Sequence, residues 1–165
     1  MTRFKPLELS DSPYFKEAEF RCKCGKCEGF PPEGISPVLI GLLTNIRKRY
    51  DHPIIIKSGY RCPDHNKAVG GAKASQHMYG RAADFVIKGM ELADCFESIA
   101  LDYGDLPIGL AINISKDASM HNGIPRGFIH IDTRGQRARW SYNAYGKEYL
   151  AGLIASSGDF AKVLA

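Results

Sequence analysis

Apolar residues recur along the chain with two different spacings, which separate expected helices from expected strands. Helical spacing marks the segments 37–50 and 92–103. The first begins at Ser36-Pro37, where a serine hydroxyl can cap the helix and proline suits its first turn. Short apolar runs, which are typical of buried strands, lie at 54–56, 83–87, 108–114 and 128–132. Leu150, Leu153 and Ile154 indicate a further helix near the end of the chain.

Interspersed helices and strands with short connections predict an α+β fold, in which helices flank a mainly antiparallel central sheet. A small parallel α/β arrangement is the alternative that the spacing leaves open. The chain has 165 residues, of which 44% are hydrophobic, and this suits a single domain with one core. Within it we expect a cysteine-containing N-terminal arm at 1–35, a core at 36–140 and a helical tail at 141–165.

Composition excludes some classes of protein and leaves others open. No apolar run approaches the roughly 20 residues that span a bilayer, so we expect no membrane span. The first six residues lead into no apolar segment, so no secretory signal is visible. The net charge of +4 is too small to choose between nucleic acid and an anionic wall polymer as a partner.

The five cysteines form an odd set, made up of Cys22, Cys24, Cys27, Cys62 and Cys95. An odd number without a visible signal peptide argues against a disulfide framework. The spacing of the first three is that of a tight knuckle, which could hold a structural zinc with Cys62 or His65 as a fourth ligand. Because a second CxxC is missing, we expect instead reduced thiols packed under a loop, or an occasional disulfide to Cys62. Cys95 lies on the apolar face of the 92–103 helix and is expected in the core.

Three side chains suited to metal binding accompany the expected strands. His77 lies in a loop before the strand 83–87, Asp84 lies in that strand, and His130 lies in the strand 128–132. Neutral imidazole and carboxylate are ligands that Zn²⁺ takes at about 2 Å. Two strands of one sheet can bring such ligands to one ion and leave a position for water, which distinguishes catalytic zinc from structural zinc. A lone histidine beside a strand is usually packed or solvated, and a lone aspartate can simply cap a turn.

The residues that carry a resemblance are Ser58-Gly59-Tyr60-Arg61, then Ser75-x-His77-x-x-Gly80-x-Ala82-x-Asp84, then His130. This pattern resembles the zinc D-Ala-D-Ala carboxypeptidase family. The family includes the vancomycin-resistance D,D-peptidases and several phage endolysins, and shares its metal site with hedgehog signalling domains. The resemblance spans about Phe15 to Trp140. It implies the same α+β fold, one zinc held by His77, Asp84 and His130, and peptide-bond hydrolysis in the bacterial cell wall.

The resemblance also implies roles around the metal. Arg61 would lie near the substrate, where a guanidinium can pair with a terminal carboxylate or stabilise an oxyanion. The alternative for Arg61 is a surface ion pair. Ser75 and Tyr60 are further candidates for substrate binding, although the serine could simply hold its loop and the tyrosine could simply pack.

The general base is the main departure from the family. Its best-known members have Glu, Asp or His three residues before the second histidine ligand, and this chain has Gly127 there. Residues i and i+2 of a strand share a face, so Asp132 should emerge beside His130. We expect Asp132 to act either as the base or as the acceptor that orients a ligand imidazole. His121, in the polar loop 116–126 that could lie over the site, is a weaker candidate.

The sequence therefore predicts a zinc metallopeptidase, monomeric, that cuts peptidoglycan stem peptides as a carboxypeptidase or endopeptidase, with D-Ala-D-Ala as the expected bond. One alternative is a wall-binding or phage structural module that keeps the fold without hydrolysis, which Gly127 favours. Another is a zinc knuckle that binds nucleic acid, but the basic residues are scattered rather than arranged in a stripe. We expect no nucleic-acid partner, and either a cytoplasmic enzyme or a phage or prophage protein released to the wall.

Overall fold

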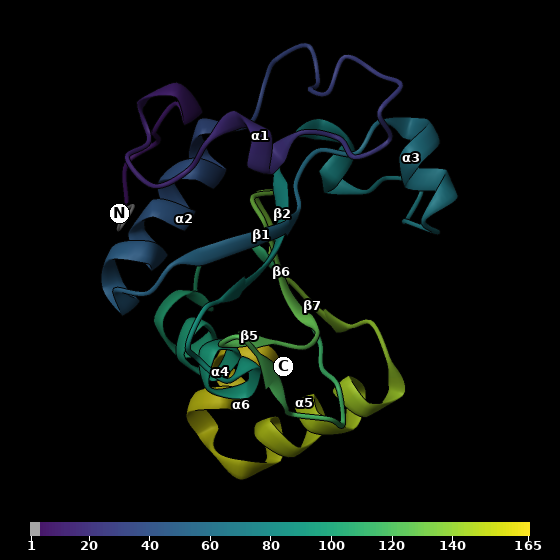
Figure 1. Cartoon of the computed structure of the whole chain (residues 1–165). Helices are drawn as coiled ribbons and strands as arrows, with labels where there is room; N and C mark the ends of the chain where they lie inside the picture. The colour runs from purple at the N-terminus through teal and green to yellow at the C-terminus, as the bar shows by residue number, and fades with distance from the viewer. Residues whose placement is uncertain (1–3) are drawn as a thin grey trace. The chain divides into compact units, whose positions relative to one another are not determined.

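The computed structural model describes residues 4–165 and contains two compact units (Figure 1). The first unit runs up to Asp51 and also holds Ile56–Asp84, and the second consists of His52–Ile55 and Phe85–Ala165. The chain passes from one unit to the other inside strands β1 (Ile54–Ser58) and β2 (Ala82–Ile87). Among the described residues, no helix is both long enough and apolar enough to cross a membrane.

The first unit contains mainly short helices and loops. Besides parts of β1 and β2, its elements are η1 (Leu9–Asp11), α1 (Glu17–Phe20), α2 (Pro37–Tyr50), α3 (Pro63–Ala68) and η2 (Gln76–Tyr79). The helix predicted at 37–50 is confirmed as α2. Its fully buried apolar residues are Leu39, Ile40, Leu42, Leu43 and Ile46. Gly41 allows the N-terminal segment to cross this helix closely, because a Cβ there would lie 2.1 Å from the carbonyl oxygen of Lys5.

The start of α2 differs from the prediction in one respect. Ser36 occupies the N-cap position, but its hydroxyl makes no capping hydrogen bond with the described residues. Its backbone N–H instead donates to the carbonyl oxygen of Gly80 at 2.8 Å. The first turn of α2 is therefore tied to the end of η2, the short helix that carries His77.

The strands form a mixed sheet in the order β1-β2-β6-β3-β7. Strand β3 (Gly109–Asn113) runs antiparallel to β6 (Phe128–Asp132) and parallel to β7 (Ala138–Ser141). This register places Ala111 of β3 opposite His130 of β6 and opposite Trp140 of β7. The predicted α+β class is confirmed. The segment Ala138–Ser141, for which no strand was predicted, contributes a parallel strand to the sheet.

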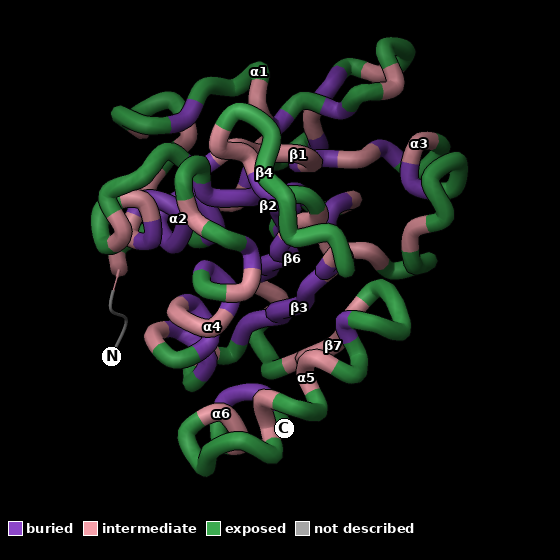
Figure 2. The backbone as a smooth tube through the Cα atoms, turned by 60° about the horizontal axis from the view of Figure 1, so that its bottom comes forward, coloured by how far each residue is buried: buried purple, intermediate pink, exposed green. Residues whose placement is uncertain are grey.

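Three helices pack together in the second unit: α4 (Leu92–Tyr103), α5 (Ala144–Ser156) and α6 (Gly158–Leu164) (Figure 1). The predicted terminal helix is therefore two helices, because Ser157 is extended and its hydroxyl caps α6 by accepting from the N–H of Phe160. In Figure 2, β2, β3 and β6 are buried along most of their length. Cys95 on α4 is buried, as predicted.

Candidate metal centre

His77 is buried in η2, and the local sequence fixes its backbone. Ser75 caps η2, with its Oγ accepting from the N–H of His77 at 3.3 Å. Gly80 ends the element in the left-handed region at a φ of 66°. A Cβ at Gly80 would lie 2.7 Å from the carbonyl oxygen of Gly34, so the tight turn here requires glycine.

The imidazole of His77 is held between a backbone carbonyl and a carboxylate. Its Nδ1 lies 2.7 Å from the carbonyl oxygen of Gly59, and its Nε2 lies 3.2 Å from Oδ1 of Asp84. A carbonyl can only accept, so Nδ1 carries a proton, and with the ring neutral Nε2 would present its lone pair to the carboxylate. Two acceptors that face each other at this distance repel unless a cation or a proton lies between them. The donor set and its orientation therefore fit a metal ion.

The predicted Ser58–Arg61 segment meets the His77 loop. The N–H of Arg61 donates to the carbonyl oxygen of His77 at 3.1 Å, and its Nη2 donates to Oγ of Ser75 at 3.2 Å. Nε of Arg61 is buried and has no hydrogen-bond partner in the described part of the chain. The same is true of Oε1 of Gln76, the residue before His77, for which the sequence predicted no role. One buried donor on Arg61 and one buried acceptor on Gln76 are therefore left without a hydrogen bond among the described residues.

Tyr60 is buried, and its backbone N–H donates to the carbonyl oxygen of Phe20 at 2.9 Å. Burial, the largest cause, raises the pKa of its phenol. These contacts support the packing role that was one of its two predicted alternatives.

His130 lies on β6 and is positioned by Asp132 on the same strand, as the two-residue spacing predicted. Its Nε2 donates to Oδ2 of Asp132 at 2.8 Å, so Nδ1 is the nitrogen that could bind an ion. The ring of Trp140 packs against the imidazole, with 5.0 Å between ring centroids. The tryptophan thus supports the histidine by packing.

Asp132 is fully buried and surrounded by donors. Arg134 donates to both carboxylate oxygens, from Nη2 at 2.6 Å and from Nε at 2.8 Å, and the N–H of Gly109 adds a bond at 3.2 Å. Burial alone would raise the pKa of Asp132, but the hydrogen bonds from Arg134 and His130 hold it well below its usual range. A carboxylate in this state accepts hydrogen bonds firmly and takes up a proton poorly. Of its two predicted roles, these contacts favour orienting His130.

Position 127 has no room for the acid of the better-known family members. Gly127 has a φ of 81°, and a Cβ there would lie 2.1 Å from the carbonyl oxygen of Asn113. The backbone conformation at position 127 therefore excludes the acidic side chain that the family pattern has there. His121 lies exposed on β4 (Met120–His121), which pairs with β5 (Ile124–Pro125) to form a hairpin within the predicted polar loop.

The sequence singled out two groups of potential metal ligands, and each is clustered. The candidate ligand atoms of His77, Asp84 and His130 lie within 4.8 Å of one another. The same holds for the sulfurs of Cys22, Cys24, Cys27 and Cys62. Cys62, rather than His65, is thus the fourth member of the knuckle. All five cysteines have free thiols, in line with the first of the two expected alternatives, reduced thiols, and the occasional disulfide to Cys62 is not present.

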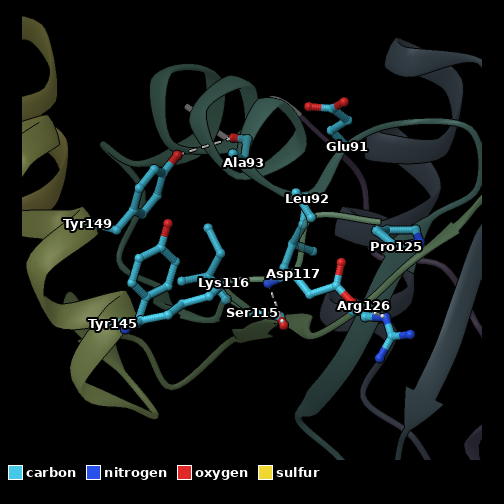
Figure 3. A pocket seen from close by; sticks show the side chains of 12 residues that line it. Glu91, Leu92, Ala93, Ser115, Lys116, Asp117, Pro125, Arg126, Tyr145 and Tyr149 are labelled. Carbon is cyan, nitrogen blue, oxygen red and sulfur yellow. Dashed lines mark hydrogen bonds and ion pairs between the residues drawn. The ribbon is translucent and has the colours of Figure 1, made fainter. Parts of the chain in front are cut away.

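A pocket in the second unit contains none of the predicted site residues (Figure 3). Its walls come from α4, α5 and the segment around the hairpin. Some polar groups on these walls bond to other protein groups: Tyr149 donates to Glu97 at 2.6 Å, and Arg126 pairs with Asp117 at 3.2 Å. Figure 3 shows Tyr145 and Lys116 side by side on the same wall, where the ammonium lies 5.7 Å from the ring centroid. We assign no function to this pocket.

Comparison with known proteins gives one family. The sequence model of the Peptidase M15 family matches residues 13–108, which is more than half of the chain. The matched range contains the four clustered cysteines, Arg61, His77 and Asp84, while His130 and Asp132 follow it. Among proteins with curated descriptions, none matches the chain. From the family match, the chain belongs to the Peptidase M15 family, the zinc D-Ala-D-Ala carboxypeptidase family whose motif it carries.

Proposed function

We propose that this protein is a zinc metallopeptidase that hydrolyses peptide bonds in peptidoglycan stem peptides. The observation that carries the proposal is the pair formed by Nε2 of His77 and Oδ1 of Asp84, two acceptors facing each other at 3.2 Å. Such a pair is stable beside a divalent cation, and without one it needs a proton between the two atoms. Family membership supports zinc as that cation and the cell-wall peptide as the substrate.

In this proposal His77 through Nε2, Asp84 through its carboxylate and His130 through Nδ1 hold the ion. Zinc bound in this way supplies an activated water and polarises the scissile carbonyl. Gly59 and Asp132 act through the two histidines: the carbonyl of Gly59 fixes the tautomer of His77, and the carboxylate of Asp132 fixes that of His130.

Arg61 and Gln76 are the proposed substrate contacts. The backbone of Arg61 is fixed by its bond to His77, while its buried Nε has no partner among the described residues. A guanidinium pairs bidentately with a carboxylate, so Arg61 suits the C-terminal carboxylate of a D-Ala-D-Ala stem. The buried Oε1 of Gln76 suits an N–H of the substrate backbone. Ser75, which accepts from Arg61, holds the guanidinium in place.

A second function is favoured by the backbone at Gly127. Because no side chain fits at this position, the base of the better-known family members has no counterpart there. A wall-binding module that keeps the zinc site without hydrolysis would show this feature.

The two functions are separated by incubating zinc-loaded protein with purified muropeptides and identifying the products by mass spectrometry. A peptidase releases D-alanine or splits cross-links, and a chelator stops it. His77→Ala should abolish the reaction, whereas His52→Ala, which removes an exposed histidine outside the predicted site, should leave it unchanged. A fully active His77→Ala protein would refute the peptidase proposal. Binding to murein without any new product would establish the wall-binding module instead.

A further inference from the structure

Four cysteine sulfurs from two distant segments of the first unit meet at one point. Cys22, Cys24 and Cys27 come from the segment after α1, and Cys62 stands 40 residues beyond Cys22, at the N-cap of α3. The sulfurs of Cys24 and Cys62 are 3.8 Å apart. A disulfide needs about 2.05 Å. In a tetrahedral site with Zn–S bonds of about 2.3 Å, two sulfurs lie about 3.8 Å apart.

Each of the four sulfurs also accepts a backbone N–H. The donors are Cys62 to Cys22 at 3.4 Å, Lys26 and Cys27 to Cys24 at 3.3 Å, Gly29 to Cys27 at 3.2 Å, and His65 to Cys62 at 3.4 Å. Donors directed at sulfur favour the thiolate, which is the form that binds metal. Gly25, with a φ of 69°, provides the left-handed turn that points the backbone groups of the knuckle inward.

We propose that Cys22, Cys24, Cys27 and Cys62 bind a second zinc ion, separate from the one at the histidines. Four thiolates select a soft or borderline metal, and a tetrahedral set of four sulfurs is typical of structural zinc. Four protein ligands leave no position for water, so this ion has no catalytic part. Binding releases the protons of the thiols and leaves a net charge of −2, which Arg21, Lys23 and Lys26 of the same segment offset.

The ion would fasten the segment after α1 to the segment that positions His77. The two already meet at one backbone bond, from the N–H of Tyr60 to the carbonyl oxygen of Phe20. Gly59 makes this approach possible, because a Cβ there would lie 2.6 Å from Cα of Phe20. The carbonyl of Gly59 orients His77, and Arg61 directly precedes Cys62. The thiolate site would therefore stabilise the substrate side of the candidate metal centre without touching the substrate.

The first test uses the unmodified protein, so it does not depend on a variant that folds. Cobalt(II) exchanged into the full chain should give intense thiolate-to-metal charge-transfer absorption in the near ultraviolet, which histidine and carboxylate ligands do not produce. In the zinc-loaded protein the four thiols should react much more slowly with a thiol reagent than after chelation. Absence of charge-transfer absorption, together with equally fast thiol reaction with and without zinc, would overturn the proposal. Iron instead of zinc in the protein as purified would overturn the choice of metal.

Variants then assign the ions. Unmodified protein should hold two zinc ions per chain by elemental analysis. Cys27→Ser should retain one ion and lose the cobalt–thiolate absorption, whereas His77→Ala should retain one ion and keep that absorption. Cys95→Ala is the matched control, since Cys95 is buried in α4 and is not in the cluster. It should hold two ions. Two ions retained by Cys27→Ser with an unchanged cobalt spectrum would contradict the assignment, whatever the peptidase assay shows.

Discussion

Asp132 accepts a 2.8 Å hydrogen bond from Nε2 of His130, and the two residues lie on one face of the same strand. Arg134 meanwhile occupies both oxygens of the carboxylate. Gly109 makes this arrangement possible from the neighbouring strand, because a Cβ there would lie 2.3 Å from Oδ2 of Asp132. Arg134 thus holds the carboxylate of Asp132, and Asp132 in turn holds the imidazole of His130 in one orientation.

This relationship predicts that Asp132→Asn weakens zinc binding rather than removing a base. We expect the zinc concentration for half-maximal peptidase activity to rise about 10–100-fold, as is usual when the partner of a ligand histidine is changed. Saturating zinc should restore most of kcat, because the reacting groups are unchanged. If Asp132 were the base, kcat would stay low at every zinc concentration. The measurement is a zinc titration of activity for the variant and the unmodified protein.

Arg61→Lys tests the proposed contact with the substrate carboxylate. Lysine keeps the charge but loses the bidentate geometry, and charged hydrogen bonds contribute about 1.5–3 kcal/mol each. We therefore expect kcat/KM for a stem peptide that ends in free D-Ala-D-Ala to fall roughly 10–150-fold, the same free energy expressed as a rate ratio.

Two comparisons control the Arg61 experiment. Zinc content should not change, because the bond between Arg61 and His77 uses the backbone N–H. The same peptide with an amidated C-terminus should be cut at similar rates by both proteins. An equal loss on both peptides would show that Arg61 acts elsewhere than on the carboxylate.

Gly127→Glu, which restores the acid of the better-known family members, should destabilise the protein instead of activating it. Its left-handed backbone costs a non-glycine residue about 1–3 kcal/mol, and the new Cβ would lie 2.1 Å from the carbonyl oxygen of Asn113. We expect a lower melting temperature and no gain in kcat. Gly152→Ala is the control, since this helical, exposed glycine has nothing within 4 Å and should tolerate alanine with a small gain in stability. A stable and more active Gly127→Glu protein would contradict this account of the backbone.

The spacing of apolar residues predicted the strands that carry Asp84 and His130, but not η2, which carries His77. Helix α2 was expected from apolar residues at helical spacing, and the strands holding Asp84 and His130 were expected from short apolar runs. The two-residue spacing of His130 and Asp132 also predicted that these side chains would meet.

Contacts made by side chains outside regular helices and strands could not be predicted in the same way. Arg134 follows the end of β6, so the alternation of side chains along the strand did not predict that it would contact Asp132. The thiol cluster depends on Cys62, which is 40 residues from Cys22 and was only one of two candidates for the fourth ligand, beside His65. The buried Oε1 of Gln76 has no signal in sequence, because its burial depends on packing around η2.

The contacts of Arg139 show how α6, the C-terminal helix, is held against the rest of the second unit. Its guanidinium donates to four backbone carbonyls: those of Gly104 and Ile108 at 2.6 Å, Val163 at 2.7 Å and Ala138 at 2.8 Å. These carbonyls come from the end of α4, the start of β3 and β7, and α6, so one side chain joins α6 to the rest of the second unit. Burial, the largest cause, lowers the pKa of Arg139 to about 10, still high enough to keep it charged at neutral pH.

Arg139→Ala should therefore loosen α6 before it affects the rest of the unit. A buried carbonyl left without its donor costs about 1–3 kcal/mol. Because this variant removes the donor of several carbonyls, we expect a loss of at least about 2 kcal/mol in the free energy of unfolding. Hydrogen exchange should become faster first in residues 158–164. Arg137→Ala is the matched control, because Arg137 is exposed and donates only to the carbonyl of the terminal Ala165 in the described contacts. Equal effects of the two variants would show that the tail is held by the packing of Val163 and Leu164 rather than by the guanidinium.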